Sequence, residues 1–348
     1  MNASKSVKTP DRSRYDGEQV PPDARNVTPE RILQRLDWQV IRRLDGLLQG
    51  DYRSLFYGYG IDFADLREYQ PGDDIRYIDW NVTARMDAPY IRQYVEDREI
   101  NAWFLIDLSP SMDFGTTHSE KRTLLIDLVA TLARLLTRHG NRVGAILYSG
   151  QVVKSGRNPM AHRIERVIPA KGDRNHVLRL INDLLKQPRL SKAAFTDLSA
   201  MLEGGLGIIK KRSLIFVLSD FISAPGWERS LQLLTHRNEV LAIRFWDPLE
   251  VELPDAGPVW MEDAETGEQL YVDTHDPKFR LQYAQLIQRR ETDLTTTLSR
   301  AGVELWSLST GEDLVRAILR HAMMRKQVHR IRGKAISESA LAATGSGR

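Results

Sequence analysis

The stretch WFLIDLSPS (residues 103–111) decides the fold of this chain. Its first six residues form a short, almost entirely apolar run, which is typical of a strand buried on both faces of a sheet. A carboxylate and two hydroxyls follow directly, and an amphipathic helical pattern covers residues 120–138. The sequence therefore predicts a buried strand that ends in a polar loop and continues into a helix.

The same alternation continues to the end of the chain. We expect strands at 103–108, 142–149, 213–219, 239–245 and 303–308 and helices at 120–138, 174–186, 197–210, 226–235, 276–300 and from 312 onward. Residues 248–274 are typical of a β-hairpin insertion, because a turn-like ETGE separates two short strand patterns. Strands that alternate with helices predict an α/β fold, a doubly wound and mostly parallel sheet with helices on both faces.

The region before the first strand divides into two parts. Residues 1–27 are polar and lack periodic hydrophobicity, so we predict a disordered tail. Thr28 and Pro29 form a helix start, and an amphipathic helix is expected from there to about Leu48. Its apolar positions are Ile32, Leu33, Leu36, Val40, Ile41 and Leu44. The helix and the stretch up to residue 100, with a strand at 90–95, make up an N-terminal helix and β extension (28–100).

Composition narrows the classes of function. The chain has 348 residues, 49 Lys and Arg against 46 Asp and Glu, and no cysteine. Without cysteine there is no disulfide framework, zinc ribbon, iron–sulfur cluster or thiol nucleophile, so a metal would be held by oxygen or imidazole. No apolar run approaches the ~20 residues of a membrane span, and the first residues lack the apolar core of a secretory signal. We therefore expect a cytoplasmic protein.

The polar loop after the first buried strand is a candidate metal site. Asp107, Ser109 and Ser111 alternate along an extended segment and can converge on one point. Thr196 at the head of a helix and Asp220 after another strand stand at similar junctions, and ligands of parallel sheets bind beyond the carboxyl ends of strands. Such oxygen ligands suit Mg²⁺ or Mn²⁺ and would leave a coordination position open for a partner's carboxylate. The alternative is that these residues only cap helices and form turns.

This pattern resembles the metal-ion-dependent adhesion site of von Willebrand factor A domains. The similarity rests on DLSPS (107–111), on the Thr of FTDL (195–198) and on the Asp of LSDF (218–221). The resemblance implies that Asp107, Ser109, Ser111, Thr196 and Asp220 bind Mg²⁺ directly or through water. It also implies that an acidic residue of a partner completes the ligand shell. The sequence departs from the family pattern in lacking the usual glycine before FTDL.

A second motif narrows the resemblance. REYQPGDDIRYIDW (67–80), followed by Ala84 and Arg85, is similar to the signature of the bacterial domain of unknown function 58 family. Together with FLIDLSPSMDFG and VLSDF the similarity covers roughly residues 50–310. It implies an A-like domain (101–325) that works beside a MoxR-type AAA+ ATPase in a chaperone-like or metal-insertion role. Many members carry N-terminal membrane helices, which this sequence lacks.

The charged segment 71–80 itself has two interpretations. Its acids and arginines lie close to Tyr69, Tyr77 and Trp80, which favours a hydrogen-bonded scaffold that joins the extension to the sheet. A partner-binding or nucleotide-sensing surface is the alternative. No P-loop, HExxH, GxSxG or dinucleotide motif is present, so we predict a non-enzymatic interaction module. A metal-dependent hydrolase that uses the same ion is the alternative from the enzyme class.

The basic charge of the chain is concentrated near its C-terminus. No acid lies between residues 314 and 337, and the seven cations there are Arg316, Arg320, Arg325, Lys326, Arg330, Arg332 and Lys334. Leu314, Val315, Ile318, Leu319, Ala322 and Met323 form an apolar helical face, and residues 326–348 are expected to be a basic, flexible tail. A solvated helix end is one interpretation of the basic surface, and binding of an acidic protein or nucleic acid is the other.

Overall fold

The structure is a computed structural model, and part of the chain can be described from it. The described residues are 28–44, 64–70, 73–75, 78, 80, 83–84, 88–94, 100–116, 119–155, 158–190 and 195–325. The predicted tails 1–27 and 326–348 lie outside these ranges. So do Arg76, Tyr77, Asp79 and Arg85, and the predicted network around segment 71–80 therefore stays a prediction.

A six-stranded sheet forms the centre of the molecule, with strands in the order β10-β7-β6-β3-β4-β5. Its strands are β3 (Asn101–Asp107), β4 (Arg142–Ser155), β5 (Asn158–Lys171), β6 (Leu214–Ser219), β7 (Glu239–Trp246) and β10 (Glu304–Ser309). All neighbours in the sheet run parallel except β4 and β5, which are antiparallel. The predicted fold class, a doubly wound α/β fold of the von Willebrand factor A type, is confirmed.

The edge strand β5 was not predicted. Strand β4 extends past residue 149 to Ser155, and β5 then returns antiparallel to it with several register shifts. Polar and charged residues such as Arg163 and Glu165 interrupt the apolar positions of β5, and Pro169 lies within it. An edge strand tolerates proline and charge because one side makes no ladder hydrogen bonds. The pattern is therefore too polar to be recognised as a strand of the same sheet.

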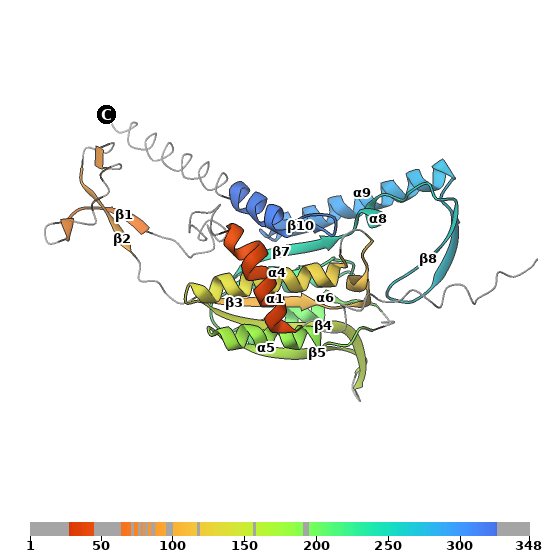
Figure 1. The fold of residues 1–348 in the computed structure, drawn as a ribbon, viewed down its shortest axis with the longest axis horizontal. Coiled ribbons are helices and arrows are strands. Elements are labelled where there is room, and N and C mark those ends of the chain that lie inside the picture. The colour runs from red at the N-terminus through yellow and green to blue at the C-terminus, as the bar shows by residue number, and fades with distance from the viewer. Residues whose placement is uncertain are drawn as a thin grey trace, which may run out of the picture.

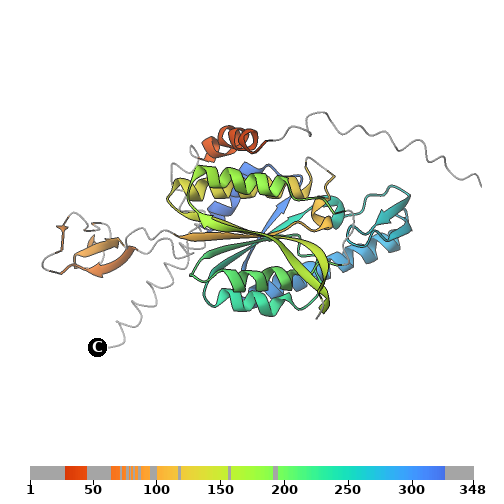
Figure 2. The same cartoon turned by 90° about the horizontal axis from the view of Figure 1, so that it is seen from below.

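Helices cover both faces of the sheet and enclose two apolar clusters (Figures 1 and 2). On one face lie α1 (Pro29–Leu36), α4 (Lys121–Arg138), α5 (Arg174–Leu185) and a helical segment at 314–325. On the other lie α6 (Leu198–Ile208), α7 (Trp227–Thr235) and α9 (Pro277–Arg300). Strand residues alternate between the clusters: Phe104 and Ile106 join the first, and Leu105 joins the second.

The N-terminal helix begins as predicted. The Thr28 hydroxyl accepts a hydrogen bond from the Arg31 amide, with Pro29 at the first helical position. The helix continues through a π-helical segment, η3 (Asp37–Ile41), to residue 44, beyond which the predicted end near Leu48 lies outside the described residues. All six predicted apolar positions are buried in the cluster that α4 and α5 also line. This segment is thus part of the A-like core.

Two small hairpins extend from the sheet. Strands β1 (Ala64–Glu68) and β2 (Tyr90–Tyr94) pair antiparallel, in agreement with the strand predicted at 90–95. The predicted insertion contains the short helix α8 (Pro248–Val251) and the antiparallel strands β8 (Pro258–Glu262) and β9 (Gln269–Asp273). Figure 2 shows this second hairpin beside the start of α9, at the opposite end of the molecule from β1 and β2.

The C-terminal helical segment differs from the prediction at one position. Val315, Ile318 and Ala322 are buried as expected, but Met323 is 65% exposed. The helix turns Ala317 and His321 toward the sheet instead. Arg320 and Arg325 form ion pairs with Glu312 and Glu304, which reduces the free positive charge of this surface. In the part of the chain that the structure describes, no helix combines the length and apolarity needed to cross a membrane.

Candidate metal centre

The loop after β3 holds its carboxylate by hydrogen bonds from both sides. Asp107 ends the buried strand and is fully buried. Its Oδ1 accepts the Ser109 amide at 2.9 Å, and its Oδ2 accepts the Ser219 hydroxyl, from the end of β6, at 2.6 Å. These bonds fix the carboxylate where two neighbouring parallel strands end. The carboxyl edge of the sheet is therefore polar although both of its faces are apolar.

The two hydroxyls of the same loop lie side by side. Ser109 Oγ and Ser111 Oγ are 3.2 Å apart, and both side chains are buried. In octahedral Mg²⁺ sites the metal–oxygen distance is 2.0–2.1 Å, so adjacent ligand oxygens are about 3 Å apart. The observed spacing between the hydroxyls is thus close to that of two ligands of one cation.

The loop that carries Thr196 is fixed from two directions. The Tyr148 hydroxyl accepts the amide of Asp197 at 2.9 Å, and the carbonyl of Thr196 accepts the Ala224 amide at 2.8 Å. The Thr196 hydroxyl is buried and makes no well-formed hydrogen bond, although it lies close enough to Glu265 to lower the pKa of that carboxyl. Buried hydroxyls usually make a well-formed hydrogen bond, so this oxygen is one that a cation or water could use.

Asp220 follows β6 in a strained turn. The next residue, Phe221, has a φ of 59°, a left-handed conformation that is uncommon for a residue with a Cβ. The Phe221 ring packs against Trp227 and holds this backbone in place. The Asp220 carboxylate accepts the Ile222 amide on Oδ1 at 3.0 Å. The Ser111 hydroxyl is one of the groups that lower the pKa of Asp220, so this carboxylate lies beside the loop after β3.

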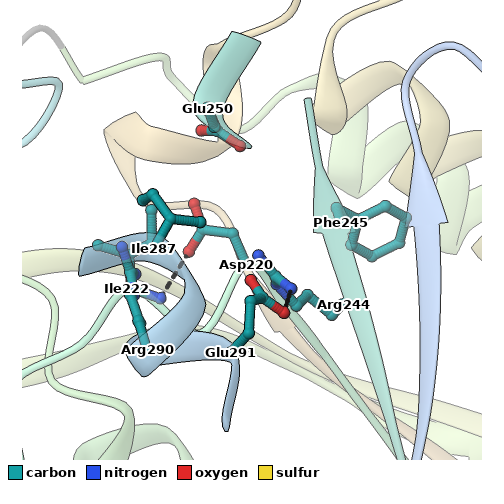
Figure 3. Close-up of a pocket in the computed structure, with 8 residues that line it drawn as sticks. All are labelled: Asp220, Ile222, Arg244, Phe245, Glu250, Ile287, Arg290 and Glu291. Carbon is teal, nitrogen blue, oxygen red and sulfur yellow. Dashed lines mark hydrogen bonds and ion pairs between the residues drawn. The ribbon is translucent and has the colours of Figure 1, made fainter. Parts of the chain in front are cut away.

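A buried lysine lies beside this aspartate. Lys121, the first residue of α4, is fully buried, and its Nζ donates to Asp220 Oδ2 at 2.8 Å and to Glu250 Oε1 at 2.6 Å. Asp220 and Glu250 line a small pocket of about 20 Å³, which has room for one water molecule. Figure 3 shows the side chains that line it. Arg244 and Glu291, which form an ion pair, line the same pocket.

The two buried aspartates have opposite electrostatics. Burial, and then the charge of Asp220, raises the pKa of Asp107 to about 7. Burial acts in the same direction on Asp220, but the Lys121 ammonium holds the pKa of that carboxyl below its ordinary value. Burial acts to lower the pKa of Lys121 itself, yet Asp220 and Glu250 keep it above its usual range. Asp107 is therefore the carboxylate without a cationic partner near it.

A further acidic side chain enters the site from the β8–β9 hairpin. Glu265 is 8% exposed, and its Oε1 accepts the Ser111 amide at 3.2 Å. Burial raises its pKa, against the lowering influence of Ser111 and the nearby Thr196. Glu265 was predicted only as part of a turn, and Lys121 was not predicted to belong to the site. A lysine in the first turn of a helix, where the dipole disfavours cations, is the one sequence signal that could have indicated the latter.

The structure thus brings the five predicted residues to one edge of the sheet. Their donor set consists of carboxylates and hydroxyls, which fits Mg²⁺ or Mn²⁺ better than a thiophilic metal. Two buried oxygens of the site, Thr196 Oγ1 and Glu265 Oε2, lie near each other and make no well-formed hydrogen bond. Within the described ranges, no group of three or more His, Asp or Glu side chains is arranged as a metal cage. The hydroxyls would therefore have to supply much of the coordination.

The architecture and the site define an α/β protein of the von Willebrand factor A type with an oxygen-lined centre at the carboxyl edge of its sheet. The family model for "Protein of unknown function DUF58" matches residues 65–293, and the chain belongs to this family. An uncharacterized protein of Mycobacterium tuberculosis is 34% identical over 295 residues, which cover 85% of this chain and 89% of the relative. One from Mycobacterium avium is 30% identical over 160 residues, covering 46% and 94%.

Solved structures with a similar arrangement are distant in sequence. The conserved hypothetical protein BatB from Bacteroides thetaiotaomicron has 13% identity and a TM-score of 0.41, over 66% of this chain and 99% of that one. The SpRpn10 VWA domain has 12% identity and a TM-score of 0.34, over 64% and 94%. The strand order β10-β7-β6-β3-β4-β5 of the chain itself defines the doubly wound fold.

Proposed function

We propose that this protein is a non-enzymatic, Mg²⁺-dependent interaction module whose centre binds an acidic residue of a partner protein. One observation carries the proposal: carboxylate and hydroxyl side chains from three loops lie close together at the carboxyl edge of the sheet, and the buried Thr196 hydroxyl among them makes no well-formed hydrogen bond. Asp107, Ser109, Ser111, Thr196 and Asp220 would hold the ion. Both oxygens of each aspartate already accept hydrogen bonds, which orient the two carboxylates.

The chemistry of the centre supports adhesion more than turnover. A divalent ion here would supply a positive charge in a water-poor site, where its attraction for a carboxylate is stronger than in bulk water. The hydroxyl ligands are neutral, so the ion keeps net positive charge for a carboxylate from outside. The partner suggested by the family resemblance is a MoxR-type AAA+ ATPase, in chaperone-like assembly or metal insertion into client proteins.

Binding to a MoxR-type ATPase from the same organism tests this proposal. Complex formation is measured by surface plasmon resonance in Mg²⁺ and in EDTA, and Mg²⁺ binding by calorimetry, for the full chain. We expect Asp107→Ala and the double variant Ser109→Ala/Ser111→Ala to lose Mg²⁺ binding by more than the 10–100-fold that outer-shell changes usually cost. Capture of the ATPase should be lost together with the ion.

Ser299→Ala is the matched control, because Ser299 is an exposed hydroxyl on α9 outside the centre. It should leave both measurements unchanged. Retention of ATPase binding in EDTA, or in variants that no longer bind Mg²⁺, would contradict the proposal. Circular dichroism of each variant establishes that a lost interaction does not come from lost folding.

A further inference from the structure

The turn of the β8–β9 hairpin buries one acidic residue among exposed neighbours. Glu265 is 8% exposed, whereas Asp263, Ala264, Thr266 and Glu268 around it are exposed. Most of the hairpin also faces solvent, including the cross-strand pair of Trp260 and Tyr271. Burial of a charged side chain from an otherwise solvated turn is unfavourable unless the group has a partner in the buried site.

The turn is built so that Glu265 is held in a fixed direction. Asp263 Oδ1 accepts the amides of Glu265 at 3.0 Å and Thr266 at 2.7 Å, and also the Thr266 hydroxyl. Gly267, with a φ of 71°, closes the turn by donating its amide to the Asp263 carbonyl at 2.7 Å. Glu265 is therefore presented to the centre by an ordered turn.

The two carboxylate oxygens of Glu265 have different surroundings. Oε1 accepts the Ser111 amide, whereas Oε2 and the Thr196 hydroxyl are buried near each other and make no well-formed hydrogen bond. A buried carboxylate whose oxygens lie beside Ser111 and Thr196, with no lysine or arginine among the groups that shift its pKa, is suited to a cation.

We propose that Glu265 is an acidic ligand supplied by the chain itself, which occupies the coordination position that a partner's carboxylate takes. This inference rests on the cation of the proposed function and specifies how access to it is controlled. The centre is then capped by its own hairpin, and a partner binds by displacing Glu265.

The β8–β9 hairpin is fixed where it leaves the domain, and Glu265 at its turn contacts the centre. This arrangement suits displacement of Glu265 by a partner. At the base, Thr274 is buried, donates its hydroxyl to the Gly257 carbonyl and accepts the Ala256 amide. Gly257 there has a φ of 80°, which a residue with a side chain rarely adopts. Val272 is the only buried residue of the two strands. Removing Glu265 from the centre would thus break few other contacts of the strands.

Mn²⁺, a paramagnetic substitute for Mg²⁺, tests the inference in the full chain. Its affinity and the water bound to it are measured together by water proton relaxation. We expect Glu265→Gln to weaken Mn²⁺ binding at least about tenfold and to raise the relaxivity of the bound ion, because a water replaces the lost carboxylate. Glu268→Gln, an exposed acid on the same hairpin, is the matched control and should behave as the unmodified protein.

An external carboxylate provides a second readout. In Glu265→Ala, acetate at millimolar concentration should restore part of the Mn²⁺ affinity and lower the relaxivity, whereas it should do neither in the unmodified protein. If Glu265→Gln binds Mn²⁺ with unchanged or higher affinity and unchanged relaxivity while Asp107→Ala does not bind, the inference is wrong and the proposed cation site stands. If the unmodified chain fails to bind Mn²⁺ or Mg²⁺ at all, the proposed function itself is overturned.

Discussion

The faces of the central sheet and its carboxyl edge are built in opposite ways. The faces bury two large apolar clusters, in which strand and helix side chains such as Phe104 and Phe216 pack directly on each other. The carboxyl edge, a few ångströms along the same strands, buries Asp107, Lys121, Asp220 and Glu265. Burial stabilises the faces, at about 25 cal/mol per Å² of apolar surface, but it penalises each charge at the edge.

This difference indicates that stability alone does not explain the residues buried at the carboxyl edge. A buried ion pair such as Lys121–Asp220 often contributes no more than apolar residues of the same shape would, because desolvation offsets attraction. Asp107 is buried without a cation beside it, and the pKa of that carboxyl is raised to about 7. The apolar faces hold the edge in place, and the edge buries charged groups that do not add to stability as the faces do.

The largest expected effect comes from breaking the edge at Lys121. Lys121→Met leaves Asp220 buried with no ammonium, and we expect a loss of about 3–5 kcal/mol in the free energy of unfolding. The double variant Lys121→Met/Asp220→Asn should recover much of this loss, because the unpaired charge is removed. Urea denaturation of both variants measures the difference.

Lys210→Met, at an exposed lysine, is the control and should change the stability by less than about 0.5 kcal/mol. An equal loss in the single and double variants would mean that packing of the lysine chain, and not the charge on Asp220, accounts for the effect. The carboxyl edge would then be stabilised by packing, as the two faces of the sheet are.

A titratable group inside one apolar cluster sharpens the comparison. His321 is 6% exposed and stacks on Trp306, with ring centroids 4.4 Å apart. Burial, and then Arg325 and Arg320, lowers the pKa of His321 to about 3, although Glu304 lies 3.9 Å from its Nδ1. The unfolded chain protonates this histidine near pH 6.5. The buried, neutral His321 side chain therefore contributes fully to stability above pH 6.5, and this contribution is lost as the pH falls toward 3.

The free energy of unfolding should fall between pH 7 and pH 5 in the unmodified protein. We expect this fall to be about 2 kcal/mol smaller in His321→Phe, because phenylalanine keeps the stacking and does not titrate. Urea unfolding at the two pH values measures it. His236→Phe, at an exposed histidine, is the control and should leave the pH dependence as it is. A pH dependence that persists in His321→Phe would assign it to the carboxylates of the edge.

The sequence predicts the apolar faces well and the edge only in part. Repeated patterns over many residues identify a strand such as β3 or a helix such as α4, because each apolar residue adds to the same signal. Asp107, Ser109 and Ser111 were found because they adjoin such a strand. Glu265 was not found, since 154 residues separate it from the serine amide that it accepts. Contacts of this kind are set by tertiary packing and leave no local pattern.

The same limit explains β5 and Lys121. The edge strand has a polar outer side, so its alternation is weak, and a lysine at the start of an apolar helix is normally exposed. Both are understood only when the neighbouring elements are in place. The sequence therefore predicts which residues are buried because they are hydrophobic. It does not predict the burial of Lys121 in an ion pair, or the position of β5 at the edge of the sheet.

Two glycines of α6 provide the smallest effect and test how tightly the faces are packed. At Gly205 an added Cβ would lie 3.2 Å from Cδ1 of Leu105 in β3, closer than ordinary van der Waals contact. At Gly207, in the same helix, nothing lies within 4 Å of that position. The two positions share their helix and differ in their packing, so they form a matched pair.

We expect Gly207→Ala to raise the free energy of unfolding by about 0.5–1 kcal/mol, because alanine loses less backbone entropy in a helix. Gly205→Ala has the same entropic gain but forces α6 away from Leu105, and a net loss of about 1 kcal/mol is expected. Urea denaturation compares the two. If both variants were stabilised equally, the packing between α6 and β3 would accommodate an extra methyl group without cost. The rigidity that we attribute to the apolar faces could then not be what holds the carboxyl edge in position.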